Sequence, residues 1–252
     1  MLTKGIKRAI AILIPLVFWL LVWELLSLVA NADFILPSPL HTLSVLLSLF
    51  GKSSFYKAVF ASLLRVLLGF AIGALMGAAL ALAAHASSLL STLIAPIMTV
   101  IKATPVASFI MVLWCFIGSS PVPTVIGALM VAPLIYHSLI KALQVKNTEL
   151  DEVCRVYKIQ GIRKFRFLYF PTILEFLIPA AVSAMGLCWK ASIAAEIIAY
   201  TKNSIGREIY LSKAFLEGAT LFAYTTVVIL LSLVFEKLMH YIGEKVKERC
   251  HL

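Results

Sequence analysis

Six long apolar runs alternate with short polar segments along this chain, and they set its predicted architecture. A helix that crosses a bilayer needs about 20 mostly apolar residues, and each run supplies them. The pattern therefore predicts an all-α integral membrane protein with spans at Ala9–Ala30, Ala58–Ala84, Leu89–Ile117, Val122–Leu143, Pro171–Tyr200 and Ala219–Tyr241. Little chain remains for a soluble domain, so we expect one transmembrane domain over residues 1–252.

The first apolar run follows three cations, Lys4, Lys7 and Arg8, as the core of a secretory signal would. Such a core holds about 7–15 apolar residues. This run is longer, and no convincing small-residue cleavage site follows it. We therefore expect a retained membrane anchor.

Three glycines in the second run lie four residues apart, at Gly69, Gly73 and Gly77. This spacing puts them on one face of a helix, where the missing side chains let another helix approach closely. We expect a helix contact there, either a static one or a seam that moves during function.

Prolines interrupt the third and fourth runs. Each proline removes a backbone donor, and neighbouring groups must compensate for that loss inside a membrane. We therefore expect bent helices that surround something. The prolines are Pro96, Pro105, Pro123 and Pro133.

The most highly charged stretch of the chain, Leu150–Pro171, separates the fourth run from the fifth. Asn147 or Thr148 can cap a helix there, acidic residues favour its first turn, and Gly161 can end it. At 100° per residue, one face of this helix is apolar and the opposite face is charged. The apolar face holds Leu150, Val153, Cys154 and Tyr157, and the charged face holds Asp151, Arg155 and Lys158. An apolar face outside the membrane needs a cover, either the lipid interface or another protein.

Composition agrees with a membrane protein, and the charge distribution orients it. Of the 252 residues, 62% are hydrophobic and 13% are charged, and the mean hydropathy is +1.00. Soluble domains are about 45–50% apolar. The net charge of +10 could indicate nucleic acid, but most of the 22 Lys and Arg residues fall on one side of the six predicted spans. The positive-inside rule then places both termini and the polar stretch in the cytoplasm, with no role for nucleic acid.

Cysteine and histidine positions indicate no metal site and no redox chemistry. Cys115 and Cys188 lie in apolar runs, whereas Cys154 and Cys250 lie in basic segments, without the paired spacing of zinc ligands. The five histidines are scattered, with neither metal nor nucleophile spacing. We therefore expect no enzyme. The chain also lacks an ATP-binding loop, so the energy for transport would come from a partner or from a gradient.

Among the ionisable residues inside the predicted spans, where a charge is costly and usually meets a polar interior or a partner, four stand out. They are Glu24, Lys102, Lys190 and Glu196. Lys190 follows Trp189 and could meet a small anion in a passage, but it could also snorkel to the outer interface or bond a neighbouring helix. The candidate passage residues are Lys102, Trp189, Lys190 and Glu196. A structural role is the alternative for Glu196, as it is for Glu24.

Several stretches of the chain resemble one family of membrane proteins. The polar stretch has Glu152, an apolar pair, Arg155 and Gly161, with Pro171 ten residues later. This arrangement resembles the cytoplasmic loop of permeases from binding-protein-dependent ABC importers. Four other stretches resemble the nitrate, sulfonate and taurine branch: FILPSP (Phe34–Pro39), SLLRVLLGFAIGALMG (Ser62–Gly77), KATPVASFIMVLW (Lys102–Trp114) and GLCWKASIAAEII (Gly186–Ile198).

The resemblance implies a type I (MetI-like) importer permease fold in a bacterial inner membrane, in which one chain forms half of the substrate pathway. It makes the loop at about residues 147–170 a coupling helix that docks on a separate ATPase. Two ATPase subunits, a second permease copy or sibling, an extracytoplasmic substrate-binding protein and the lipid bilayer would be the partners. ATP and Mg²⁺ would bind the ATPase, and this chain would bind no cofactor or metal. The implied coupling residues are Glu152, Val153, Cys154, Arg155, Tyr157, Lys158 and Gly161.

The branch also implies a small anion, such as a sulfonate or nitrate, as the substrate. The chain departs from the family pattern: Val153 and Cys154 replace an Ala pair, and Lys158 replaces a Gly. Glu175 stands where a second proline is usual. Two alternatives stay open: a permease for a vitamin precursor of the pyrimidine or riboflavin type, and a secondary transporter or channel that needs no ATPase.

Overall fold

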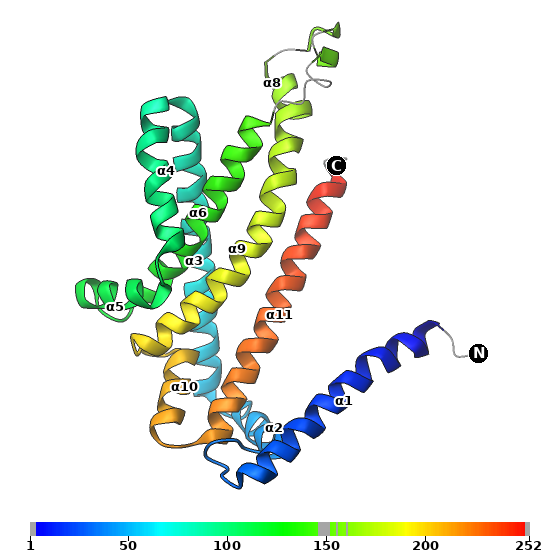
Figure 1. Ribbon diagram of the computed structural model, residues 1–252, viewed down its shortest axis with the longest axis vertical. Coiled ribbons are helices and arrows are strands. Elements are labelled where there is room, and N and C mark those ends of the chain that lie inside the picture. Colours follow the sequence, from blue (N-terminus) through cyan, green and yellow to red (C-terminus); the bar gives the residue numbers. More distant parts are fainter. Residues whose placement is uncertain (1–3, 146–151, 155, 160, 250–252) are drawn as a thin grey trace.

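The computed structural model describes residues 4–145, 152–154, 156–159 and 161–249, and the regular elements within these ranges are all helical (Figure 1). Five of these helices are long and apolar enough to cross a membrane, and a bent pair of shorter helices raises the number of possible spans to six. The five are α1 (Lys4–Ala30), α3 (Ser53–Ala86), α6 (Val122–Gln144), α9 (Phe170–Ile198) and α11 (Gly218–Arg249). The predicted all-α membrane architecture is confirmed.

The third predicted span, Leu89–Ile117, is not one helix. It divides into α4 (Ser88–Ala103) and α5 (Val106–Ile117), which are bent by 104° relative to each other. Pro105 has no backbone N–H and disfavours a helical conformation at Thr104, whose ψ is 135°. The helix therefore ends before this proline, and α5 runs sideways from the bundle (Figure 1). The other three of the four prolines in the third and fourth runs lie within helices: Pro96 in α4, and Pro123 and Pro133 in α6.

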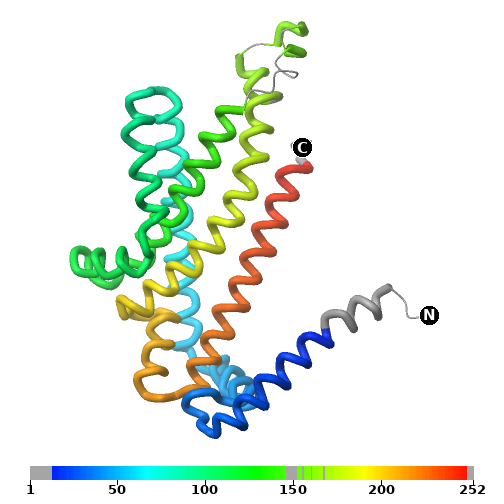
Figure 2. Tube along the Cα trace, viewed as in Figure 1, coloured from blue at the N-terminus to red at the C-terminus, as the bar shows by residue number. Residues whose placement is uncertain are grey.

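Helices α3, α6 and α9 pack side by side at the centre of the molecule (Figure 2). The closest approach is between α3 and α6, at the three spaced glycines. A Cβ atom on Gly69 would lie 2.7 Å from the Thr124 carbonyl oxygen, and one on Gly73 would lie 2.5 Å from that of Ala128. One on Gly77 would meet the Ala132 carbonyl. The glycine spacing predicts a closely packed partner helix, and this partner is α6.

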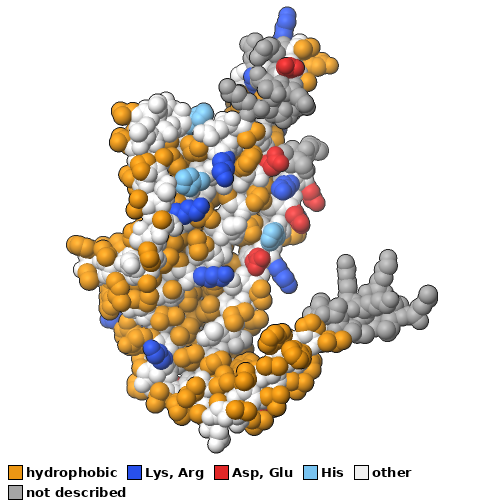
Figure 3. Space-filling model, viewed as in Figure 1, with side chains coloured by type: hydrophobic (Ala, Val, Ile, Leu, Met, Phe, Trp, Pro, Cys, Tyr) orange, Lys and Arg blue, Asp and Glu red, His pale blue; other side chains and the backbone are white. Residues whose placement is uncertain are grey.

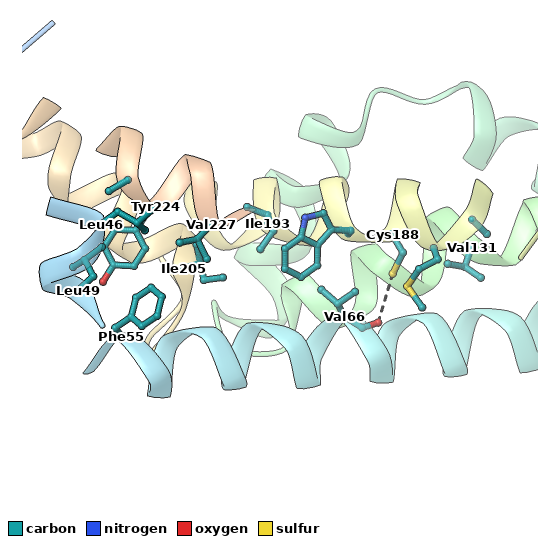
Figure 4. Close-up of a cluster of buried hydrophobic side chains, with 14 of the residues drawn as sticks. Leu46, Leu49, Phe55, Val66, Val131, Cys188, Ile193, Ile205, Tyr224 and Val227 are labelled. Atoms are coloured by element: carbon teal, nitrogen blue, oxygen red, sulfur yellow. Dashed lines mark hydrogen bonds between the residues drawn. The ribbon is translucent and has the colours of Figure 1, made fainter. Parts of the chain in front are cut away.

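Buried apolar side chains join this centre to α11 and to α2 (Pro39–Leu49) (Figure 4). Helix α2 begins at Ser38, whose side chain accepts a hydrogen bond from His41 N at 3.2 Å. A serine cap and a proline in the first turn both favour a helix start, so the local sequence explains why α2 begins at this point. Labelled members of the core are Leu46, Leu49, Phe55, Val66, Val131, Cys188, Ile193, Ile205, Tyr224 and Val227.

Helix α1 lies apart from the other spans along most of its length and is attached at its C-terminal end (Figure 1). Trp23 Nε1 donates a hydrogen bond to Pro37 O at 3.0 Å, and Ser27 Oγ donates one to Leu36 O at 2.8 Å. Only 6% of the segment Leu13–Ala30 is buried. This leaves a long apolar surface that suits lipid or another subunit.

The two ends of the bundle differ in what they carry. The stretch between α6 and α9 lies at the same end as the last turns of α11, and α2 and α10 (Ile205–Ala214) lie at the opposite end (Figure 1). Helix α9 follows α8 (Ile162–Lys164) and the π-helix η1 (Phe165–Tyr169) without a break. Pro171 therefore sits in the first turn of α9, near the expected start of the fifth span.

Candidate functional site

The polar stretch contains a short helix at the end of the bundle, described at Glu152–Cys154 and at Val156. Ile159 N donates a hydrogen bond to Cys154 O at 2.8 Å, and Lys158 between them has a φ of 52°. A left-handed residue closed by such a bond is a common helix C-terminus. The prediction that Gly161 ends this helix is wrong, because Lys158 already takes the left-handed position. Gly161, with φ 61°, instead precedes α8.

Large apolar side chains are exposed around this short helix. Cys154, predicted on the same apolar face as Tyr157, is only 7% exposed, so that face divides into a buried part and an open part. Glu152 and Lys158 are also exposed, and Arg155 lies outside the described residues. The exposed apolar side chains are Val153 (48%), Val156 (78%), Tyr157 (74%) and Ile162 (84%). Such a group at a charged end of a protein is typical of a docking surface.

A groove of about 550 Å³ lies between α9 and α11 and holds ionisable side chains. Lys190 lies on its α9 wall, and Glu236 and His240 lie on its α11 wall. Figure 3 shows side chains of both charges and histidine gathered over this part of the molecule. The remaining lining residues are Pro179, Val182, Ser183, Gly186, Leu187 and Ser232.

Trp189 does not reach this groove, although it is the neighbour of Lys190. Its side chain is 1% exposed, its Nε1 donates a hydrogen bond to Val228 O at 3.1 Å, and its ring centroid lies 5.2 Å from that of Phe235. These contacts join α9 to α11 inside the core. An aromatic ring used in this way supplies packing and a satisfied donor rather than an open surface.

Glu196 is fully buried near the C-terminal end of α9, where three groups surround its carboxylate. Ser62 Oγ donates a hydrogen bond to Oε2 at 2.8 Å, and Gly206 N donates one to the same oxygen at 3.2 Å. The guanidinium of Arg65 lies 3.3 Å from Oε1. Arg65 also donates to the carbonyl oxygens of Lys202 (2.9 Å) and Asn203 (3.2 Å). The cluster therefore ties α3 and α9 to the turn that leads into α10.

Lys102 and Glu24, the other two ionisable residues singled out in the sequence, lie outside these clusters. Lys102 is exposed in the last turn of α4, just before the bend, and Glu24 is half-buried in α1. In the part of the chain that the structure describes, neither side chain forms an ion pair within 4.0 Å. The described residues also contain no group of three or more His, Cys, Asp or Glu side chains that could hold a metal ion.

Sequence reasoning missed the partners of both clusters. Arg65 and Ser62 lie on one helix face three residues apart, which is a usable signal once a partner for Glu196 is required. Glu236 and His240 are likewise one turn apart near the end of the sixth predicted span, with Lys237 between them. Nothing in the local pattern pairs these residues with α9, because the contacts join segments far apart in the chain.

Comparison with known proteins gives a consistent result. The family model of the binding-protein-dependent transport system inner membrane component matches residues 69–248. The nitrate import permease protein NrtB of Synechocystis sp. (strain ATCC 27184 / PCC 6803 / Kazusa) is 26% identical over 207 residues, covering 77% of this chain and 72% of that protein. Among solved structures, an inward facing conformation of the MetNI methionine ABC transporter superposes with a TM-score of 0.54.

That superposition covers 77% of this chain and 93% of the matched chain at 19% identity, so it speaks for the fold alone. The helices and the matched region agree with the predicted type I importer permease fold. They also agree with the resemblance to the nitrate and sulfonate branch. This chain therefore belongs to the family of binding-protein-dependent transport system inner membrane components.

Proposed function

We propose that this chain, as one transmembrane domain over residues 1–252, is the permease subunit of an ATP-driven importer and forms half of its substrate passage. Family membership supports the role. Ionisable side chains also gather over α4, α6, α9 and α11 on one face (Figure 3), where lipid would solvate them poorly. A second copy, or a related sibling, facing this side would enclose a polar passage.

The family also supports two kinds of partner: an ATPase and an extracytoplasmic substrate-binding protein. We assign two ATPase subunits, which bind ATP and Mg²⁺, to the end of the bundle that carries the short helix. The observation that carries this assignment is the exposed apolar group of Val156, Tyr157 and Ile162. Burying an aromatic anchor in a pocket supplies binding energy, and the charges of Glu152 and Lys158 beside it would fix orientation.

Replacement of Tyr157 by Asp tests this coupling surface. The new charge would enter a desolvated pocket at a cost of several kcal/mol, so the ATPase should no longer copurify while the spans stay folded. Phe215→Asp is a matched control, because Phe215 is 71% exposed at the opposite end of the molecule. Retained ATPase and transport in the Tyr157→Asp variant would contradict the docking assignment, whereas transport by the unchanged protein without any copurifying ATPase would favour a secondary transporter.

We infer a small anion as the substrate. The name of the relative NrtB, a nitrate import permease protein, supports this class. Lys190 in the groove between α9 and α11 supports it too, because this cation has no ion-pair partner within 4.0 Å among the described residues. A fixed positive charge attracts an anion more strongly in a low-dielectric passage than in water. Lys102, exposed at the α4 bend, is the second cation proposed for this route.

Removal of the Lys190 charge tests the anion proposal. Lys190→Gln should slow uptake of an anionic substrate while assembly and ATP hydrolysis remain measurable. Lys213→Gln, at an exposed position on α10, controls for general loss of charge. Transport at the original rate by Lys190→Gln, or an uncharged cargo such as a vitamin precursor, would contradict the anion proposal.

A further inference from the structure

A second, smaller groove lies between the first half of α9 and the last turns of α11, toward the end of the bundle that carries the short helix (Figure 1). Its volume is about 180 Å³. A buried water needs two to four polar partners, and the side chains here offer none, so the groove favours hydrocarbon over water. The lining residues are Leu174, Leu177, Ile178, Ala181, Met239, Ile242, Gly243 and Val246.

This apolar groove opens on the opposite side of the α9–α11 contact from the polar groove. Ala181 lines the apolar groove and Ser183 lines the polar one, and two positions correspond to about 200° around a helix. On α11, Ile242 and Glu236 are six positions apart, which leaves them about 120° apart around the axis. The apolar groove therefore faces away from the ionisable side chains that line the polar one.

The groove is narrow, because α9 and α11 approach closely along it. A Cβ atom on Gly243 would lie 2.6 Å from Ile178 Cγ2. The lining segments 174–181 and 239–246 each rise by about 10 Å along their helices. An α-helix with its side chains is about 10–12 Å across, too wide to enter a groove of about 180 Å³. Part of a linear hydrocarbon chain fits this shape.

A cation stands at the rim of this groove. Lys245 follows Ile242 by three positions, about 60° around α11, and its side chain is exposed. Its Nζ lies 4.8 Å from the ring centroid of Tyr241, which is also exposed. Among the residues that the structure describes, Lys245 has no ion-pair partner within 4.0 Å. Tyrosine rings gather where a membrane meets water, so this ammonium lies at the depth of lipid headgroups.

The other charges at this end also favour a negative headgroup. Arg163 in α8 and Arg166 in η1 are exposed in the turns that precede α9. Glu244 lines a separate hollow on α11 together with Glu236, and not the apolar groove. Basic side chains near a membrane surface attract anionic lipids.

We propose that the apolar groove and Lys245 form a binding site for one anionic phospholipid. An acyl chain lies between α9 and α11, and the phosphate accepts a charge-assisted hydrogen bond from the Lys245 ammonium. Lipid tails are as apolar as the groove, so the headgroup charge and the fit of the chain, not hydrophobic burial, distinguish this lipid from its neighbours. The site goes beyond the proposed import function and does not depend on the imported solute.

Photochemical labelling from inside the bilayer tests the site. The full chain, with the subunits that copurify with it, is placed in phosphatidylcholine nanodiscs that contain a trace of a diazirine-tailed lipid. Two such lipids, phosphatidylglycerol and phosphatidylcholine with identical tails, are compared, and labelled peptides are mapped. The phosphatidylglycerol probe should label the segments 174–181 and 239–246 about fivefold more, the factor that one Lys or Arg contributes beside an anionic membrane surface. Labelling of α3 serves as the internal reference for general lipid contact.

Two variants separate the headgroup from the chain. Lys245→Gln should bring the two probes to equal labelling, whereas Lys237→Gln, an exposed cation in the separate hollow on the same helix, should preserve the preference. Ile242→Trp fills the groove and should reduce labelling by both probes. Leu75→Trp, at an exposed position on α3, is its matched control and should leave the labelling of the groove unchanged.

Several results would overturn the lipid site. Equal labelling by both probes, a preference that survives Lys245→Gln, or a groove still labelled in Ile242→Trp would each do so. Competition by excess glycerol 3-phosphate would assign the site to a soluble phosphate, and loss of labelling on binding of the ATPase would assign the groove to a protein. None of these results bears on the import function, which ATPase copurification and uptake test separately.

Discussion

Glu196 shows how one buried side chain can organise a membrane bundle. Its carboxylate accepts hydrogen bonds from α3 and from the start of α10, and it pairs with Arg65, so three segments depend on it. Gly206 must be a glycine for this arrangement, because a Cβ atom there would meet the Glu196 side chain. Tyr200 and Asn203 in the same turn have positive φ values of 52° and 49°. A strained turn of this kind persists only where surrounding contacts hold it.

Removal of this carboxylate should be more harmful than removal of the whole pair. Glu196→Ala leaves the Arg65 guanidinium without its counter-ion and should cost roughly 3 kcal/mol of unfolding free energy. Glu196→Ala combined with Arg65→Met should recover part of that loss. Thermal unfolding of the single and double variants measures the coupling. Glu217→Ala, at an exposed site, is the control; a strictly additive double variant would contradict the ion-pair account.

At the scale of elements, the contact between α3 and α6 depends on the absence of side chains. A Cβ atom on Gly73 would lie 2.5 Å from Ala128 O and 2.8 Å from the Val131 Cβ, and both neighbours sit on a helix that is itself packed. The clash is with backbone, so a rotamer change cannot relieve it. The two helices would have to separate.

Gly73→Ala should therefore destabilise the bundle even though Ala favours a helix more than Gly does. We expect a lower unfolding temperature, because an overpacked contact costs about 1–3 kcal/mol. Gly186→Ala is the matched control: its Cβ atom meets nothing within 4 Å, so its unfolding temperature should stay equal or rise slightly. Equal effects of the two substitutions would show that the close approach is unimportant.

The helices also show which features of the fold the sequence predicts and which it does not. The fourth predicted span, Val122–Leu143, differs from α6 by one residue at its end, because apolar content and length determine a membrane helix almost alone. The run Leu89–Ile117 was equally apolar, yet it bends by 104° at Pro105 and not at Pro96. Apolar content alone does not predict which of several prolines will interrupt a helix. Likewise, Glu196 was recognised as unusual, but its partners Ser62 and Arg65 lie more than 130 positions away.

At the scale of the whole molecule, Lys and Arg residues are concentrated at one end of the bundle. The stretch between α6 and α9 and the last turns of α11 lie together at one end (Figure 1), and both are rich in Lys and Arg. The opposite end carries α2 and α10. The positive-inside rule predicts that the proposed coupling end, and with it both chain termini, faces the cytoplasm.

Cysteine labelling in intact cells tests this orientation. Cys154 is a poor reporter because it is 7% exposed, so cysteines are better introduced at Lys158 and Lys213, which are exposed at opposite ends in a background without Cys115 and Cys250. A membrane-impermeant maleimide should label Lys213→Cys from outside and should label Lys158→Cys only after the cytoplasmic face is opened. Each variant is compared with itself before and after the cytoplasmic face is opened. A difference in expression between the two variants therefore cannot produce the expected difference in labelling. Labelling of Lys158→Cys in intact cells would invert the orientation and would move the proposed ATPase surface to the wrong side of the membrane.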